Sequence, residues 1–188
     1  KMDDLEIKGT PGQFEDAYAN YNLLGEVIER VSGETYEEYI TENILDANKM
    51  MSTYTLRQNP EFQEEVAVSY QNYFGYPVVG EYEYDQNDNW AGVSSGLLLS
   101  DVKDMGKYLQ MFLKEGDEVV EPESIAAVLE NTVSMAGDET AGGIFGTEEE
   151  YGMGWISTEV GGEQIYYQNG MLENHMSMMV LMPERKTG

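Results

Sequence analysis

Asn20 to Gly33 reads Asn-Tyr-Asn-Leu-Leu-Gly-Glu-Val-Ile-Glu-Arg-Val-Ser-Gly, and this stretch decides the fold. Its apolar residues recur at the spacing of one helical face, with charged residues on the other face. The apolar positions are Leu23, Leu24, Val27, Ile28 and Val31. Gly33 stands where a left-handed C-terminal cap favours a residue without a Cβ atom. The stretch therefore predicts a buried helix whose Leu24 and Ile28 face the core.

A second helix is expected directly after this one. Thr35 and Glu38 have the spacing of a capping box, in which each side chain bonds the backbone N–H of the other residue. Tyr36, Ile40 and Ile44 then follow along one side of the helix. Taken by itself, the region from about 21 to 45 predicts a buried helical hairpin, an arrangement found in many folds.

The composition limits the classes of function. Thirty-six acidic residues against ten basic ones give a net charge of −26, which disfavours binding to nucleic acid and to anionic membranes. The absence of cysteine excludes disulfides and thiol catalysis. A single histidine and no clustered ligands predict no metal site. No stretch is long and apolar enough to span a bilayer, and the start at Lys1 has no signal-peptide pattern and reads as internal.

Two more helices are expected in the middle of the chain. Ser100 is the predicted cap of a helix that runs to about Lys114, with Gly116 beyond its end. Its core face is expected to contain Val102, Met105, Leu109, Phe112 and Leu113. Pro122 suits the first position of a shorter helix, in which Ile125 points inward.

The last part of the chain predicts an antiparallel sheet. Strands are expected over residues 152–158, 164–167 and 175–182, and Gly161-Gly162 joins the first two as a hairpin. Residues 66–70 and 77–84 are candidate strands or irregular loops. Helices followed by an antiparallel sheet indicate an α+β fold, and 188 residues indicate one domain.

Several motifs, in order along the chain, resemble the serine β-lactamase-like family. That family includes penicillin-binding D-Ala-D-Ala peptidases, class C β-lactamases and related esterases. The motifs are Asn20-Tyr21-x-Leu23-Leu24-Gly25, Asn43-Ile44, Ser95-Gly96-x-Leu98-x-Ser100, Asp104-Met105, Tyr151-Gly152-x-Gly154-Trp155 and Pro183-Glu184-x-x-x-Gly188. The resemblance covers nearly the whole chain, from Pro11 to Gly188. It implies one partial β-lactamase/transpeptidase-like domain over 1–188. A helical region would cover about 12–135 and sheet strands about 151–183, with flanking segments of the same protein needed to complete the fold.

Short strings that match the family's catalytic motifs occur in the wrong places. Ser100-Asp101-Val102-Lys103 reads Ser-x-x-Lys, and Lys186-Thr187-Gly188 reads Lys-Thr-Gly. In the family the serine precedes the Tyr-x-Asn motif, yet Tyr18-Ala19-Asn20 precedes Ser100. If Tyr167-Gln168-Asn169 were the Tyr-x-Asn motif, the family order would be restored. Too few residues would then remain before Lys186 for the intervening helices of the family. Ser100 is therefore interpreted as a helix cap, and the resemblance places the nucleophile segment before Lys1.

The resemblance also implies two walls of a binding site. Without a shift, the alignment puts Asp16-Ala17-Tyr18 where the family has Tyr-Ser-Asn. A two-residue shift instead gives Tyr18 and Asn20 the roles of proton relay and substrate-binding amide. Gln168-Asn169-Gly170 occupies the family's His-x-Gly position, where a glutamine can donate a hydrogen bond but carries no charge. Gly170 would let a substrate approach the strand closely.

Two functions follow from the resemblance. The first is an acyl-transfer serine hydrolase that acts on D-Ala-D-Ala peptides, β-lactams or small esters, using a serine-lysine pair outside this chain and no cofactor. The second is a non-catalytic relative that binds a peptide or partner in the former cleft; a plain structural fragment is a third reading. The family implies a cell-surface or secreted location. If the fold is right, Tyr18 or its neighbours Asp16 and Asn20 should lie within about 10 Å of Gln168 to Gly170, the width of a small-ligand pocket.

Overall fold

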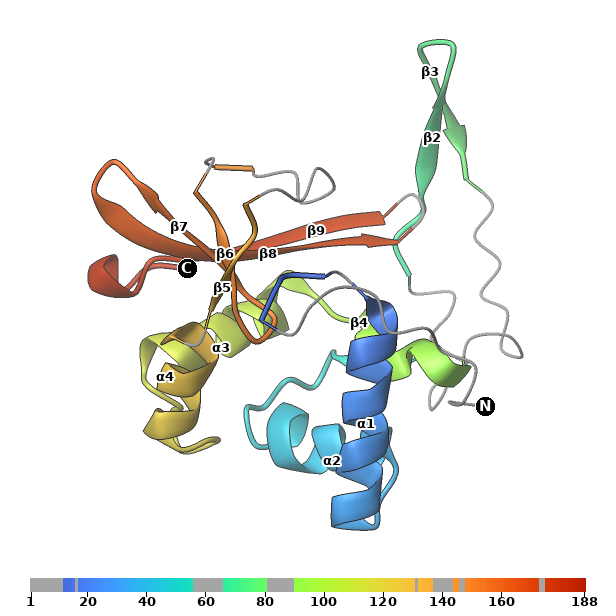
Figure 1. Cartoon of the computed structure of the whole chain (residues 1–188). Helices are drawn as coiled ribbons and strands as arrows, with labels where there is room; N and C mark the ends of the chain where they lie inside the picture. The colour runs from blue at the N-terminus through green and yellow to red at the C-terminus, as the bar shows by residue number, and fades with distance from the viewer. Residues whose placement is uncertain are drawn as a thin grey trace.

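The computed structural model of the chain describes residues 12–15, 17–55, 66–80, 90–130, 132–136, 144–145, 148–172 and 175–188. Its α-helices are α1 (Tyr18–Ser32), α2 (Tyr36–Ile40), α3 (Val102–Leu113) and α4 (Pro122–Glu130). A π-helix (Thr41–Asp46) continues α2, and 3-10 helices cover Trp90–Ser95 and Pro183–Arg185. The four α-helices lie on one side of the largest sheet (Figure 1).

That sheet has five antiparallel strands in the order β5-β6-β7-β8-β9. They are β5 (Val133–Ser134), β6 (Glu150–Tyr151), β7 (Ile156–Val160), β8 (Glu163–Leu172) and β9 (His175–Leu181). Two smaller sheets pair β1 (Tyr54–Thr55) with β4 (Leu98–Leu99), and β2 (Tyr70–Tyr73) with β3 (Tyr76–Val79). The fold class is α+β, as the sequence predicts. The region expected to be helical also holds these small sheets.

The predicted signals at the ends of elements are present. Gly33 has φ 80° and its N–H donates to the Glu29 carbonyl at 2.9 Å, so it caps α1 in the left-handed conformation. Thr35 and Glu38 form the capping box at the start of α2. Gly161 and Gly162, with φ 63° and 85°, make the turn between β7 and β8.

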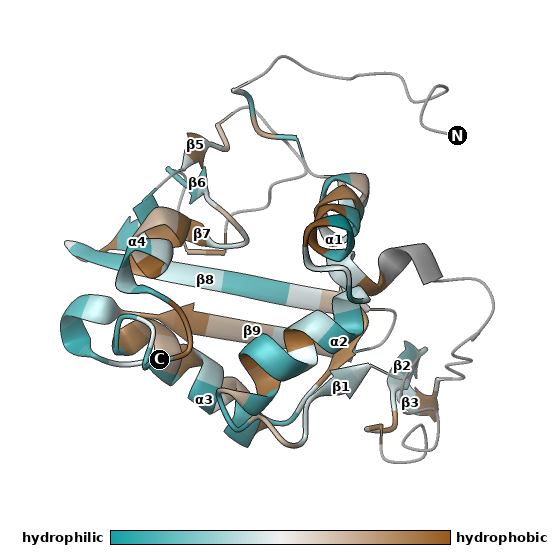
Figure 2. Cartoon of the chain, turned by 90° about the horizontal axis from the view of Figure 1, so that it is seen from below, coloured by the Kyte–Doolittle hydropathy of each residue, from teal (hydrophilic) through white to brown (hydrophobic). Residues whose placement is uncertain are grey.

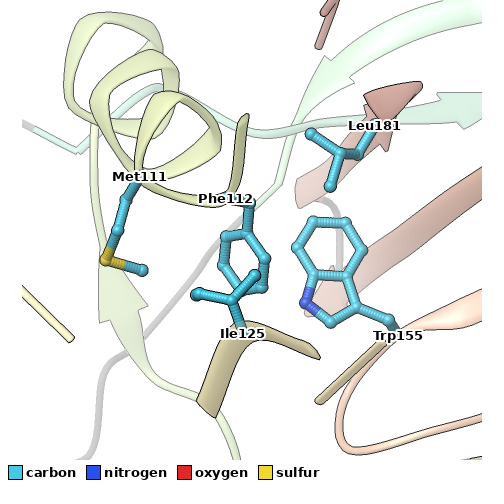
Figure 3. Close-up of a cluster of buried hydrophobic side chains, with 5 residues drawn as sticks. All are labelled: Met111, Phe112, Ile125, Trp155 and Leu181. Carbon is cyan, nitrogen blue, oxygen red and sulfur yellow. The ribbon is translucent and has the colours of Figure 1, made fainter. Parts of the chain in front are cut away.

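The core lies between α3, α4 and one end of the sheet. A cluster of five buried side chains forms it: Met111, Phe112, Ile125, Trp155 and Leu181. The rings of Phe112 and Trp155 meet edge to face with centroids 5.0 Å apart, and Leu181 packs beside them (Figure 3). Of the predicted apolar face of α3, Phe112 is buried, Met105, Leu109 and Leu113 are half-buried, and Val102 is 85% exposed.

The predicted burial of α1 is wrong. Leu24 is 56% exposed, and Leu23, Val27 and Val31 are also exposed. The other predicted core residue, Ile28, is half-buried, and Gly25 is the buried residue of the helix. A Cβ atom placed on Gly25 would lie 2.6 Å from the Cβ of Ser94, closer than real Cβ atoms approach. The helix thus docks through its glycine against the 3-10 helix Trp90–Ser95. Figure 2 shows apolar residues along α1 and α3 alike, although only α3 buries its apolar face.

The predicted cap of α3 is one residue off. Asp101 is the N-cap, and its Oδ1 accepts the backbone N–H groups of Lys103 and Asp104, each at 2.9 Å. The Ser100 hydroxyl instead bonds the Thr53 hydroxyl at 2.7 Å. A carboxylate at the N-cap also suits the positive end of the helix dipole, which favours Asp101 over the neighbouring serine.

Candidate active site

The start of α1 lies beside the carboxyl-terminal half of β8, on the helical side of the sheet (Figures 1 and 2). These are the two segments that the sequence names as walls of one site. About 150 positions separate them in the sequence, so only the tertiary fold brings them near each other. The expected width of about 10 Å stays a prediction.

The register of β8 with β9 decides which candidate side chains face the helices. Tyr166 pairs with Leu181, Gln168 with Met179 and Gly170 with Ser177. Because alternate residues share a face and Leu181 belongs to the core under α3, Gln168 and Gly170 also face the helical side. Asn169, which pairs with Met178, faces the opposite side. The three candidate substrate-binding residues are therefore divided between the two faces of the sheet.

Gly170 packs closely against the next strand. A Cβ atom at this position would lie 2.6 Å from the Ser177 hydroxyl oxygen. The Ser177 side chain therefore occupies the space that a larger residue at 170 would fill. A rotation of that hydroxyl would open the backbone of β8 at Gly170 to an incoming group.

The side-chain amide of Gln168 lies on the same face of β8 as Gly170. Its Nε2 donates to the Asn169 carbonyl at 3.2 Å, whereas its Oε1 is buried and has no hydrogen-bond partner among the described residues. A buried amide oxygen without a partner loses its hydration with no compensating bond. Gln168 thus presents a buried amide oxygen that a ligand group could satisfy.

The candidate residues on α1 are open to solvent. Tyr18 is 71% exposed, and the exposed Asn20 donates its backbone N–H to the Ala17 carbonyl at 3.0 Å. Asp16 lies outside the described residues. Tyr18 and Asn20 both lie in the first turn of the helix, and their exposure leaves each open to a ligand.

A tyrosine pair that the sequence analysis did not single out as part of the site ties α1 to the sheet. The Tyr21 hydroxyl bonds the Tyr151 hydroxyl, and the ring of Phe14 packs on Tyr151 with centroids 5.2 Å apart. Both tyrosines belong to motifs of the family resemblance, and Tyr21 follows Tyr18 by nearly one helical turn. That spacing was the available signal. The contact holds the start of α1 against β6 and so helps fix one wall of the candidate site.

Ser100 and Lys103 do not have the surroundings of a catalytic pair. The Ser100 hydroxyl bonds Thr53, which also contacts the Asp104 carboxylate at 3.1 Å, while Lys103 is exposed. Asp104 is 2% exposed and further accepts the N–H of Ser52 at 2.6 Å. These bonds join α3 to the turn before β1, so the group is structural.

The charge of Asp104 is held by Lys107, whose Nζ lies 2.6 Å from Oδ1. Burial raises the pKa of Asp104, but the hydrogen bonds from Lys107, Ser52 and Thr53 outweigh burial and lower it below its ordinary value. The carboxylate stays ionised near neutral pH. Lys107 is thereby committed to this ion pair.

Tyr167 is unsuited to proton transfer. It is fully buried on the face of β8 away from the helices, and its hydroxyl donates to Glu149 Oε1 at 2.7 Å. Burial and the bond to Glu149 raise the pKa of Tyr167 to about 12. Such a phenol keeps its proton at neutral pH, so the string Tyr167-Gln168-Asn169 is not a functional Tyr-x-Asn motif.

The described part of the chain holds neither a candidate metal cluster nor a membrane-spanning helix. Within the described ranges, no group of three or more histidine, cysteine, aspartate or glutamate residues is placed to hold a metal ion. Among the same residues, no helix has the length and apolar content to cross a bilayer.

Comparison with known proteins assigns the family. A family model described as Beta-lactamase matches residues 7–188, so the chain belongs to the β-lactamase family. The protein flp of Staphylococcus aureus strain MW2 is 26% identical over 184 residues, which cover 97% of this chain and 34% of that protein. The chain therefore spans about a third of the length of this curated relative.

Solved structures share the fold. The octameric penicillin-binding protein homologue from Pyrococcus abyssi superposes with a TM-score of 0.78 and 32% identity, over 95% of this chain and 38% of that one. A D-stereospecific amidohydrolase from Streptomyces sp. gives a TM-score of 0.73 at 19% identity, over 97% and 51% of the two chains. This chain thus has the β-lactamase/transpeptidase-like fold.

Proposed function

We propose that this chain is part of a serine hydrolase of the β-lactamase family and supplies two walls of its substrate cleft. The substrate would be a small molecule or peptide with an acyl bond, such as a D-amino acid amide, a D-Ala-D-Ala peptide, a β-lactam or an ester. The observation that carries the proposal is the face of β8. Gln168 and Gly170 point to the side of the sheet on which the start of α1 lies.

Each candidate residue has a role that its chemistry permits. Gly170 lets the substrate backbone lie along β8, and the Gln168 amide bonds the substrate's carboxylate or carbonyl. Tyr18 serves as the phenol that relays a proton, and Asn20 supplies an amide, with Asp16 in place of the phenol in the unshifted register. A serine-lysine pair in flanking sequence performs the acyl transfer, in which the amine takes the hydroxyl proton.

The second candidate function is ligand binding without catalysis. Gln168 stands where the family has a histidine or lysine, and it can neither carry a charge nor transfer a proton. The unshifted register would also remove the relay phenol from α1. The same cleft would then hold a peptide or a partner protein. For either function, family resemblance favours a location outside the cytoplasm.

A binding experiment tests the shared part of both functions. D-phenylalanine amide is titrated into the whole chain while amide chemical shifts are followed by NMR, and Gly170→Ala is compared with Gly96→Ala. Gly96 is a matched control, because a Cβ atom there meets nothing within 4 Å. We expect shifts at 168–170 and about tenfold weaker binding for Gly170→Ala only, a loss of about 1.4 kcal/mol. Absence of binding, or equal loss in both variants, would overturn the placement of the cleft.

A labelling experiment separates catalysis from binding. A fluorescent penicillin should not label this chain covalently, and it should label a longer protein that includes the upstream segment. Labelling of the longer protein with loss on substitution of its own serine supports the hydrolase, and no labelling supports the binding protein. Stoichiometric labelling of this chain that Ser100→Ala abolishes would contradict both readings.

A further inference from the structure

The β2–β3 hairpin stands apart from the rest of the molecule. Figure 1 shows it projecting away from the five-stranded sheet and from the helices. Every residue of both strands is exposed. A hydrogen bond from the Gly80 N–H to the Ser69 carbonyl at 2.9 Å closes its base, and His175 Nε2 lies 2.7 Å from the Ala67 carbonyl. The hairpin is therefore attached at its base to the start of β9, and its tip extends into solvent.

The hairpin carries no charge. Residues 66–80 include no Asp, Glu, Lys or Arg, in a chain whose net charge is −26. A neutral segment of this length is unusual where about a quarter of all residues are charged. A surface that remains in water gains nothing from this neutrality, whereas a surface that leaves water avoids the cost of dehydrating charges.

Apolar residues occupy both faces of the hairpin. The register pairs Tyr73 with Tyr76 on one face, and Tyr70 with Val79 on the other. A flat protein partner would cover one face of such a ribbon and leave the other in water. A medium that surrounds the tip, as the interfacial layer of a lipid bilayer does, contacts both faces at once.

The tip exposes its largest apolar side chain in a costly conformation. Phe74 is 87% exposed and has φ 50°, a left-handed value that Asn or Gly adopts far more readily. The Gly75 N–H donates to Asn72 Oδ1 at 2.8 Å, and the rings of Tyr73 and Phe74 meet edge to face at 4.8 Å. A phenylalanine at this position costs stability through backbone strain and exposure, which points to a contact that it makes with something outside the chain.

We propose that the tip of this hairpin inserts into the interface of an uncharged or zwitterionic lipid surface. Phe74 enters the boundary of the acyl chains, and Tyr73 and Tyr76 lie at the headgroup level, where an aromatic ring with a polar end is favoured. Insertion is shallow, because the outer edges of a two-stranded ribbon carry backbone groups that need water. The net charge of the chain disfavours an anionic surface and leaves a zwitterionic one open.

The test is co-sedimentation of the whole chain with phosphatidylcholine vesicles. Phe74→Asn is the informative variant, because asparagine suits the left-handed turn and should leave the folded state intact or more stable. Val31→Ser is the matched control, since Val31 is a similarly exposed apolar residue on α1. We expect about tenfold weaker partitioning for Phe74→Asn, the loss of roughly 1.4 kcal/mol of apolar transfer, and no change for Val31→Ser.

Vesicle charge and salt sharpen the test. Vesicles rich in phosphatidylglycerol should bind the chain weakly at low salt and better at 1 M salt, where charge repulsion is screened. No binding to phosphatidylcholine, or equal binding by wild type and Phe74→Asn, would overturn the proposal. Self-association that Phe74→Asn removes, without vesicle binding, would also overturn it and would assign the hairpin to contacts between copies of the chain. These outcomes are independent of amide binding at β8.

Discussion

Helices α1 and α3 have similar sequence patterns but differ in how far their apolar faces are buried. Both carry a stripe of apolar residues at helical spacing, and the sequence predicts that both stripes are buried. In α3, Met111 and Phe112 enter the core beside Trp155. In α1, the apolar stripe that contains Leu24 lies open, and the helix docks through Gly25 instead.

The difference shows what hydrophobic periodicity measures. It identifies which face of a helix is apolar, but the contact is decided by which face can approach its neighbour closely. Gly25 has no Cβ atom, so α1 can approach Ser94 to a distance that any other residue would prevent. The arrangement leaves the start of α1 beside β8, where the proposed cleft requires it.

The largest effect is expected in the α3 core. Phe112→Ala should cost about 3–5 kcal/mol of unfolding free energy, because it removes a ring packed on Trp155 and leaves a cavity. Val102→Ala in the same helix serves as the control and should cost less than about 0.5 kcal/mol, since Val102 is exposed. Urea unfolding measures both. Similar losses in the two variants would mean that the core is elsewhere.

The next effect concerns the buried carboxylate of Asp104, which pairs with the partly exposed Lys107 and links α3 to the turn before β1. Asp104→Asn should cost about 3 kcal/mol, because it leaves Lys107 without its carboxylate and weakens the bonds to Ser52 and Thr53. Asp117→Asn is a matched control: the Asp117–Lys114 pair has the same i,i+3 spacing but is exposed, so its loss should be under about 1 kcal/mol.

The same pair predicts a dependence on pH. The folded pKa of Asp104 is lowered, so its stabilisation is complete above the ordinary carboxyl value of about 4 and is lost as pH falls through the lower folded value. The stability gap between wild type and Asp104→Asn should therefore be constant from pH 7 to about 5 and shrink below about 4. A gap that widened in acid would contradict the assignment of the charged state.

A smaller effect is expected where α1 docks. Gly25→Ala should cost about 1–3 kcal/mol through overpacking against Ser94, although alanine is by itself the better helix former. Adding Ser94→Gly removes the opposing Cβ atom and should recover much of the loss. A stabilising Gly25→Ala, or a loss that Ser94→Gly leaves unchanged, would show that the two elements do not approach closely.

Local signals made much of the fold predictable. The cap at Gly33, the capping box of Thr35 and Glu38 and the turn at Gly161-Gly162 act over a few residues, so the sequence alone identifies them. The order of helices followed by antiparallel strands predicts the α+β class, and the family resemblance supplies the β-lactamase/transpeptidase-like architecture. The cap of α3 was misplaced by one residue, because Ser100 and Asp101 are both good caps and only the geometry of the turn selects between them.

The candidate site was predictable only in part. The sequence named α1 and β8 as its walls, but the register that sends Gln168 and Gly170 to one face and Asn169 to the other depends on pairing with β9. The bond between Tyr21 and Tyr151 spans 130 positions, and no local pattern encodes it. Burial likewise depends on non-local contacts, which is why the exposed stripe of α1 was predicted to be core.

The unfolding free energy of Leu24→Ala, compared with that of Gly25→Ala, tests the central contrast most directly. Leu24 is 56% exposed, so its truncation should cost less than about 1 kcal/mol and less than the neighbouring glycine substitution. Urea denaturation of both variants at pH 7 gives the two values. A loss of about 2–5 kcal/mol for Leu24→Ala, as for a buried leucine, would contradict the account and restore the apolar stripe as the buried face of α1.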